Sequence, residues 1–253
     1  MMTNKVWQRF TRACAAAAMA LGIGLPAAAA DVGLDLPIMS QYVWRGLQVN
    51  EEPVLQPSLT VDFGSGVGFN LWGNLDLTGY GEEAGYANRA GEFTELDLTL
   101  SYDRSFGPLS VGAGVISYVF PGIGATTHEL YVSAGASIPA NPSLTVYTDV
   151  DEVKGSYFLL ALAENLPLAA GPLGGVDVGV SAGYGSATHN RAYYGIENAK
   201  PIDAAARLAL PFALGPIGLT PSAAYVHILD EEIGDALDET GYLVVGLTAS
   251  ASF

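Results

Sequence analysis

The sequence predicts an all-β fold, a single closed antiparallel transmembrane β-barrel of about twelve strands, and three observations support this prediction. Half of the 253 residues are hydrophobic and only 14% are charged. Segments that alternate apolar with small or polar residues recur along the chain, which is the pattern of strands whose two faces meet different surroundings. Tight glycine and proline turns alternate with longer polar connections, as expected for short periplasmic turns and longer extracellular loops.

The apolar content does not come from a membrane-spanning helix. After residue 30 the longest apolar run, Tyr157 to Ala163, has seven residues and stops at Glu164, whereas a spanning helix needs about 20. Every backbone group must find a partner inside a lipid bilayer, so a chain without such a helix can cross only as a closed sheet.

Residues 1–30 are typical of a cleaved secretory signal, and residues 31–253 are assigned to the barrel. Three basic residues precede an apolar stretch that ends before Pro26, and an Ala28-Ala29-Ala30 cleavage site precedes Asp31. Removal of this segment leaves 7 basic residues (10 − 3) against 26 acidic ones, a net charge near −19 (7 − 26). This sign excludes nucleic acid as a partner.

Twelve strands are expected, and an even number places both ends of the barrel segment at the periplasmic rim. Their predicted ranges are 32–44, 54–64, 67–78, 93–106, 109–120, 126–138, 143–151, 155–167, 176–185, 200–212, 217–229 and 240–253. In 93–106, for example, Leu96, Leu98 and Leu100 share one face and Glu95 and Asp97 the other. The inward face of the fifth, eighth and eleventh strands stays open.

The last strand shows the two faces most clearly, because alternate residues from Leu243 to Phe253 are apolar while most of the intervening ones are small and polar. The apolar row is expected to face lipid. Aromatic residues gather near strand ends, where girdles of interfacial anchors are expected. The predicted anchors are Tyr42, Trp44, Tyr102, Phe106, Phe212 and Phe253.

Charged residues on the opposite faces are expected to line the lumen. The candidates for lumen lining and selectivity are Arg45, Asp62, Asp76, Glu95, Asp97, Asp103, Glu129, Asp149, Asp177, Asp203 and Arg207. This acidic excess predicts a preference for cations in a hydrated pore. Arg45 is expected either to turn inward near the mouth as a charge filter, or to stay at the rim, paired with Glu51 or Glu52 or with lipopolysaccharide phosphate.

No catalytic residue, metal or cofactor is expected. The stretch GVSAG at 179–183 matches a hydrolase motif, but it lies within a strand and lacks the strand–turn–helix setting of that motif. His128 opens a motif resembling a zinc-protease helix, but Val132 stands where the second histidine is needed. Whether the acidic stretch 230–239 binds divalent cations stays open, since it lacks the calcium-loop spacing.

Two stretches, SQYVWRGL at 40–47 and PVLQPSLTVDF at 53–63, resemble the amino-terminal pattern of the TorF-like porin family of proteobacteria. The matching residues are Ser40, Tyr42, Val43, Trp44, Arg45, Gly46, Pro53 and Gln56. The resemblance implies a porin in the outer membrane of a Gram-negative bacterium. The terminal phenylalanine resembles the signal that the barrel assembly machinery recognises.

The favoured interpretation is a passive outer-membrane diffusion channel for small hydrophilic solutes or ions, cation-preferring and not an enzyme. A plugged structural barrel that does not conduct is the main alternative. Less favoured are a lipid-acting outer-membrane enzyme, which would need a serine–histidine pair on the lipid face, and a soluble β-sandwich. The expected partners are outer-membrane lipid, lipopolysaccharide and the assembly machinery. The oligomeric state is left open.

Overall fold

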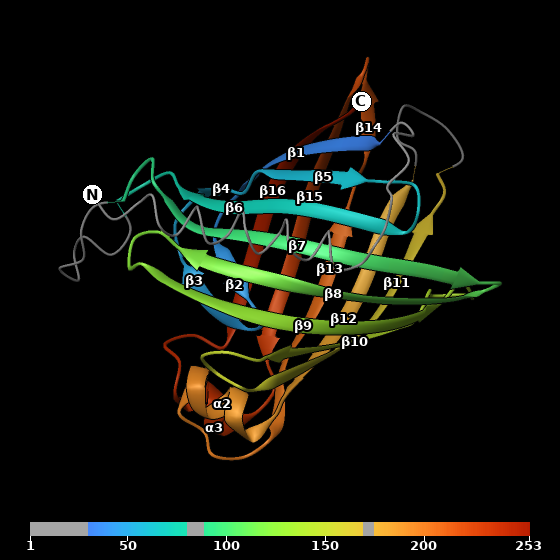
Figure 1. Ribbon diagram of the computed structural model, residues 1–253. Helices are drawn as coiled ribbons and strands as arrows, with labels where there is room; N and C mark the ends of the chain where they lie inside the picture. The colour runs from blue at the N-terminus through green and yellow to red at the C-terminus, as the bar shows by residue number, and fades with distance from the viewer. Residues whose placement is uncertain (1–29, 80–88, 169–174) are drawn as a thin grey trace.

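The structure is a computed structural model that describes residues 30–79, 89–168 and 175–253 (Figure 1). Apart from Ala30, the predicted signal segment lies outside the described residues. Most of the predicted turn at 168–175 and part of the predicted long connection at 79–92 lie outside them as well.

Twelve antiparallel strands form the wall of the barrel, as the sequence predicts. They are β1 (Asp31–Met39), β4 (Val54–Leu55) with β5 (Ser58–Asp62), β6 (Val67–Asp76), β7 (Phe93–Phe106), β8 (Leu109–Phe120), β9 (Ala125–Ala136), β10 (Ser143–Asp149), β11 (Ser156–Leu166), β12 (Val176–Gly185), β13 (Lys200–Ala209) with β14 (Phe212–Leu214), β15 (Ile217–Ile228) and β16 (Gly241–Ser252). Pro57 and Pro211 lie at the interruptions of the two divided strands, where a missing backbone N–H stops the ladder.

The barrel closes between its first and last strands. β1 pairs with β16 from Gly33 opposite Ser252 to Met39 opposite Gly246. Beyond this ladder the Ser40 N–H donates to the Val245 carbonyl at 2.8 Å, and the Val245 N–H donates to Ser40 Oγ at 3.0 Å. Gln41 Nε2 donates to the Leu243 carbonyl at 2.9 Å. The sheet therefore has no free edge at this junction.

Side chains alternate across the wall with the predicted register. In β16, Leu243 is 60% exposed on the outer surface, whereas Tyr242 is 3% exposed and faces inward. The three strands left open by the sequence are now resolved: β8 directs Tyr118 inward, β11 directs Tyr157 inward, and β15 directs Val226 and Ile228 inward. The outer surface is an apolar belt, and the inner surface carries the polar and small residues.

Two short helices lie at the rim opposite the C-terminus (Figure 1). These are α2 (Ala187–Tyr194), whose N-cap Ser186 accepts from the His189 N–H, and α3 (Glu231–Asp235), capped by Asp230. Neither these helices nor any other helix within the described ranges is long and apolar enough to cross a membrane. This rim carries the longer connections, and we call it the long-loop rim; the other is the short-turn rim.

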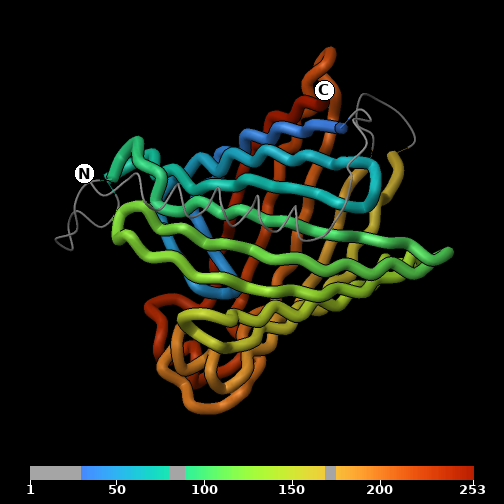
Figure 2. Tube along the Cα trace, in the orientation of Figure 1, coloured from blue at the N-terminus to red at the C-terminus, as the bar shows by residue number. Residues whose placement is uncertain are grey.

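The predicted first strand, 32–44, is wrong at its end, because β1 stops at Met39. The chain instead forms a separate two-stranded sheet from β2 (Tyr42–Trp44) and β3 (Leu47–Asn50). Arg45 and Gly46 make the turn between them, with positive φ of 49° and 83°, as a two-residue hairpin turn of this kind requires. We call residues 42–50 the inner hairpin, which Figure 2 shows in blue among the strands.

The inner hairpin and the helices fill the long-loop half of the barrel. A core cluster joins Tyr157, Ile202, Ile228 and Tyr242 from the wall to helix residues such as Ile233. Val43 and Leu47 of the inner hairpin pack against this cluster. This half of the lumen is therefore packed with side chains.

Candidate functional site

The candidate site is the contact between the tip of the inner hairpin and the barrel wall. Arg45 Nη1 and Nη2 donate to the two carboxylate oxygens of Glu129 on β9, at 2.8 and 2.7 Å. The two side chains are only 8% and 4% exposed. The Tyr118 hydroxyl donates to the same carboxylate at 2.7 Å. Such a two-pronged, charge-assisted pair fixes both position and orientation.

Three aromatic rings surround the guanidinium of Arg45. Its central carbon lies 4.4 Å from the ring centroid of Trp44, 4.6 Å from that of Tyr147 and 4.7 Å from that of Tyr157. Each distance is within the range of a cation–π contact, and such contacts strengthen when water is excluded. The tip of the hairpin is thus held by electrostatic attraction from several directions.

The backbone of the tip is also held tightly. The Tyr194 hydroxyl of α2 donates to the Arg45 carbonyl at 2.7 Å. A Cβ added at Gly46 would lie 2.9 Å from Ile228 Cδ1 and 3.0 Å from Asp203 Cβ. Only glycine combines this close approach with the left-handed backbone of the turn.

The base of the inner hairpin has its own polar contacts with the wall. Asn50 Nδ2 donates to Asp76 Oδ1 at 2.9 Å, and Asn74 Nδ2 donates to the same oxygen at 3.0 Å. Tyr42 is 8% exposed, and its ring centroid lies 5.6 Å from that of Trp72. The hairpin is therefore attached at both ends.

The structure places Arg45 inside the barrel, as one of the two predicted alternatives requires, but paired with Glu129 and not with Glu51 or Glu52. The anchor prediction is wrong for Tyr42 and Trp44, because both belong to the inner hairpin and contact inner side chains. Apolar residues occupy alternate positions in β1, and Tyr42 and Trp44 fall in the same alternation. The sequence pattern of this strand inside the lumen therefore cannot be told apart from that of a wall strand.

The other predicted anchors lie away from the lumen. Tyr102, Phe106 and Phe253 are 49%, 61% and 79% exposed, on the outer surface toward the short-turn rim. Phe212 is half-buried on β14. Their role as anchors stays a prediction. Near the long-loop rim, outer aromatics that were not predicted also meet, since the Phe158 and Tyr184 ring centroids lie 6.3 Å apart.

The predicted lumen carboxylates occupy inward positions, but the structure divides them into three groups. Those that contact the inner hairpin or the core around it are Asp76, Glu95, Glu129 and Asp203. Two serve local structure: Asp62 accepts from the Gly64 N–H, and Asp149 accepts from the N–H groups of the following loop. The remainder are Asp97, Asp103 and Asp177, with Arg207. Their role in selectivity stays a prediction.

A family of known proteins is similar to the segment of the chain that carries most of this site. A family model described as "Bacterial protein of unknown function (Gcw_chp)" matches residues 25–149, just under half of the chain. We call residues 25–149 the Gcw_chp segment, because the chain is similar to that family over this range. The Gcw_chp segment includes the inner hairpin, Asp76, Tyr118 and Glu129, so most of the contacts that hold the hairpin lie within it. The resemblance to TorF-like porins stays a prediction.

Two solved structures share the barrel fold with most of this chain. The KdgM porin superposes with a TM-score of 0.50 at 12% identity, covering 85% of this chain and 97% of that one. The NanC porin does so with a TM-score of 0.50 at 10% identity, covering 86% and 98%. Identities this low show the fold alone. No curated protein sequence matches the chain.

A serine–histidine pair lies on the outer surface of the barrel, away from the inner hairpin. His128 Nδ1 lies 3.0 Å from Ser117 Oγ, across the β8–β9 ladder. The pair lacks the parts of a hydrolase, because no described acid or amide hydrogen-bonds to His128 Nε2 and the surrounding backbone N–H groups serve the ladder. We interpret it as two polar groups that satisfy each other beside lipid.

Acidic residues do not form a metal site in the described parts of the chain. Within these parts, no three His, Cys, Asp or Glu side chains are grouped so that they could hold an ion. In the acidic stretch 230–239, Lys200 Nζ pairs with Asp230 at 3.0 Å and with Glu232. Whether the remaining carboxylates there bind divalent cations stays a prediction.

His189 of α2 is a buried neutral side chain beside the hairpin of the Gcw_chp segment. It is 1% exposed and its Nε2 has no partner among the described residues. Burial, reinforced by the positive charge of Arg45 and opposed by Asp149, lowers its pKa to about 3. The unfolded side chain takes up a proton near pH 6.5, which the folded one excludes.

We therefore expect His189 to contribute a loss of stability as pH falls from about 6.5 toward 3, and no change above pH 6.5. His189→Gln should reduce the slope of stability against pH in this window. Tryptophan fluorescence during urea unfolding in detergent micelles at several pH values measures both chains. Equal slopes for the two would show that His189 titrates normally in the folded state.

Proposed function

We propose that the protein is a passive outer-membrane diffusion channel for small hydrophilic solutes or ions, closed at its long-loop half by the inner hairpin. The observation that carries the proposal is that β2 and β3 pair only with each other. The ladders of the twelve-stranded wall include neither β2 nor β3, so the hairpin can leave the lumen without breaking a wall ladder. The likeness in fold to two porins supports this reading.

The proposal includes the setting of the channel. Residues 1–30 direct the chain across the inner membrane and are removed, and the barrel assembly machinery inserts the rest. The apolar belt contacts outer-membrane lipid, and the long-loop rim faces lipopolysaccharide. The apolar outer surface and the alternating strands support these assignments.

Conductance in planar bilayers tests the channel. The paired ends Tyr42 and Asn50 lie side by side, so a short glycine–serine linker can replace residues 42–50 while Ser40 and Gln41 keep their contacts with β16. We expect the full chain to conduct rarely, and the chain without the hairpin to show frequent discrete steps. If that variant folds and remains silent, the protein is not a channel.

A second candidate function is a structural barrel that does not conduct, and the packing of the hairpin is the observation that supports it. Val43 and Leu47 contact the buried core, and the tip is held by an ion pair shielded from water. Under this alternative the hairpin is a permanent part of the core. The silent hairpin-free variant described above, shown by circular dichroism to be folded, would support it.

Cation preference is part of the proposal and gives a second test. Glu95 and Asp97 point into the lumen from β7, and described inward carboxylates outnumber Arg45 and Arg207. In the hairpin-free background, Glu95→Gln with Asp97→Asn should shift the reversal potential in a salt gradient toward zero. Asp62→Asn, at a turn of the short-turn rim, is the matched control. An unchanged reversal potential would contradict the role of β7 in selectivity.

A further inference from the structure

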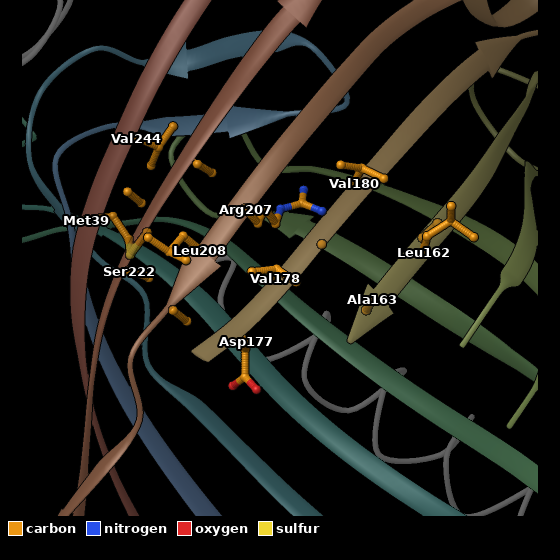
Figure 3. A pocket seen from close by; sticks show the side chains of 15 residues that line it. Met39, Leu162, Ala163, Asp177, Val178, Val180, Arg207, Leu208, Ser222 and Val244 are labelled. Atoms are coloured by element: carbon orange, nitrogen blue, oxygen red, sulfur yellow. The ribbon is translucent and has the colours of Figure 1, made fainter. Parts of the chain in front are cut away.

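A cavity of about 390 Å³ lies along the short-turn half of the wall (Figure 3). Its lining comes mainly from β11, β12, β13 and β15, and most of the side chains are small or apolar, including Ala161, Ala163 and Gly179. Only two of the lining residues are charged, namely Asp177 and Arg207. The small side chains leave room for a solute beside one carboxylate and one guanidinium.

These two charges do not pair with each other. In the β12–β13 ladder Asp177 lies opposite Ala209 and Arg207 opposite Gly179, so the two are diagonal neighbours whose backbones lie about 7–8 Å apart. Figure 3 shows the guanidinium and the carboxylate directed away from each other. Neither side chain forms an ion pair with any residue in 30–79, 89–168 or 175–253.

Neutral neighbours hold the two charges apart. Arg207 Nη1 donates to Ser181 Oγ at 3.4 Å, toward the inner hairpin. Asp177 Oδ1 accepts from Asn165 Nδ2 at 2.6 Å, toward the short-turn rim. Neither neighbour neutralises the charge that it contacts, so an anionic and a cationic group can still be attracted at separate points.

We infer that this cavity binds an extended zwitterion the length of a two- or three-residue peptide. Its carboxylate lies against Arg207 and its ammonium against Asp177. An extended chain advances about 3.3–3.6 Å per residue, so two or three residues cover the roughly 7–8 Å between the two backbone positions, which a single α-amino acid cannot. The inference rests on the proposed channel in one respect, because it names short peptides as a class of solute that the channel would carry. Binding of the peptide can be measured whether or not the protein conducts.

Isothermal titration of the folded full chain in detergent tests the inference with four probes. Triglycine carries both charges at the required distance, N-acetyl-triglycine only the negative one, triglycine amide only the positive one, and glycine both at short range. We expect the dissociation constant of triglycine to be about tenfold or more below those of the other three probes, because each of them lacks one of the two charged contacts. Equal binding of triglycine and N-acetyl-triglycine would reduce the cavity to an anion site and overturn the inference.

Two substitutions locate the site. Asp177→Asn should weaken triglycine to the level of N-acetyl-triglycine, and Arg207→Gln should weaken it to the level of the amide. Arg104→Gln, at an exposed position on the outer surface of β7, is the matched control and should change nothing. Absence of triglycine binding by the folded wild-type chain, or an equal loss in the control, overturns the inference. A chain that binds but does not conduct would refute the channel alone.

Discussion

Replacement of Arg45 and Glu129 together by glutamine is expected to raise the ratio of open to closed channel by about tenfold to a hundredfold. The pair contributes two charge-assisted hydrogen bonds in a site shielded from water, and a hydrogen bond to a charged group is worth about 1.5–3 kcal/mol. Both charges leave at once, so neither remains buried without a partner. The wall should keep its stability while the hairpin is released more often.

Single-channel recording in planar bilayers measures this ratio as the open probability. Arg191→Gln with Glu197→Gln is a matched control, because it removes an ion pair of the same kind that lies at 3.4 Å on the exposed surface, with side chains 56% and 70% exposed. Surface pairs of this kind contribute little. An unchanged open probability in the Arg45 and Glu129 variant would show that their ion pair does not control the hairpin.

Glu129→Ala alone is expected to destabilise the docked hairpin by about 3–5 kcal/mol, more than the double variant does. It leaves the Arg45 guanidinium buried without its counter-charge, and breaking one side of a buried pair costs about this much. The Tyr118 hydroxyl also loses its acceptor. The single variant should therefore be less stable than the double glutamine variant.

Tryptophan fluorescence during urea unfolding in detergent micelles is a direct measurement of this loss. In residues 31–253 the tryptophans are Trp44 and Trp72; Trp44 lies in the hairpin, and Trp72 contacts Tyr42. Both therefore report on docking. A double-mutant cycle over Arg45 and Glu129 isolates the coupling between them. A loss below about 1 kcal/mol in Glu129→Ala would mean that the aromatic rings and Gly46 hold the hairpin without the carboxylate.

The wall of the barrel could be predicted because lipid and lumen impose opposite chemistry on successive residues. The row from Leu243 to Phe253 identifies its outer face without any structure. The inner hairpin could not be separated from β1 by this pattern, since Tyr42 and Trp44 continue the alternation inside the lumen. A sharper signal was present: Arg45 and Gly46 between two apolar stretches fit a two-residue hairpin turn.

Contacts between side chains of different strands could not be predicted from the sequence, for a different reason. The pairing of Arg45 with Glu129, and of Ser117 with His128, depends on register across ladders that periodicity leaves undetermined. The cavity around Asp177 and Arg207 likewise depends on small residues from several strands. Inward-facing charges could be identified, but their partners required the structure.

The attachment of Ser40 and Gln41 to β16 fixes one end of the inner hairpin to the closing junction of the barrel. Ser40 N–H and Gln41 Nε2 donate to the carbonyls of Val245 and Leu243, and the β1–β16 ladder is complete without residues 42–50. A hairpin that leaves the lumen therefore stays tethered beside the opening. Its return is a step within one molecule, so the rate of closing should not depend on protein concentration.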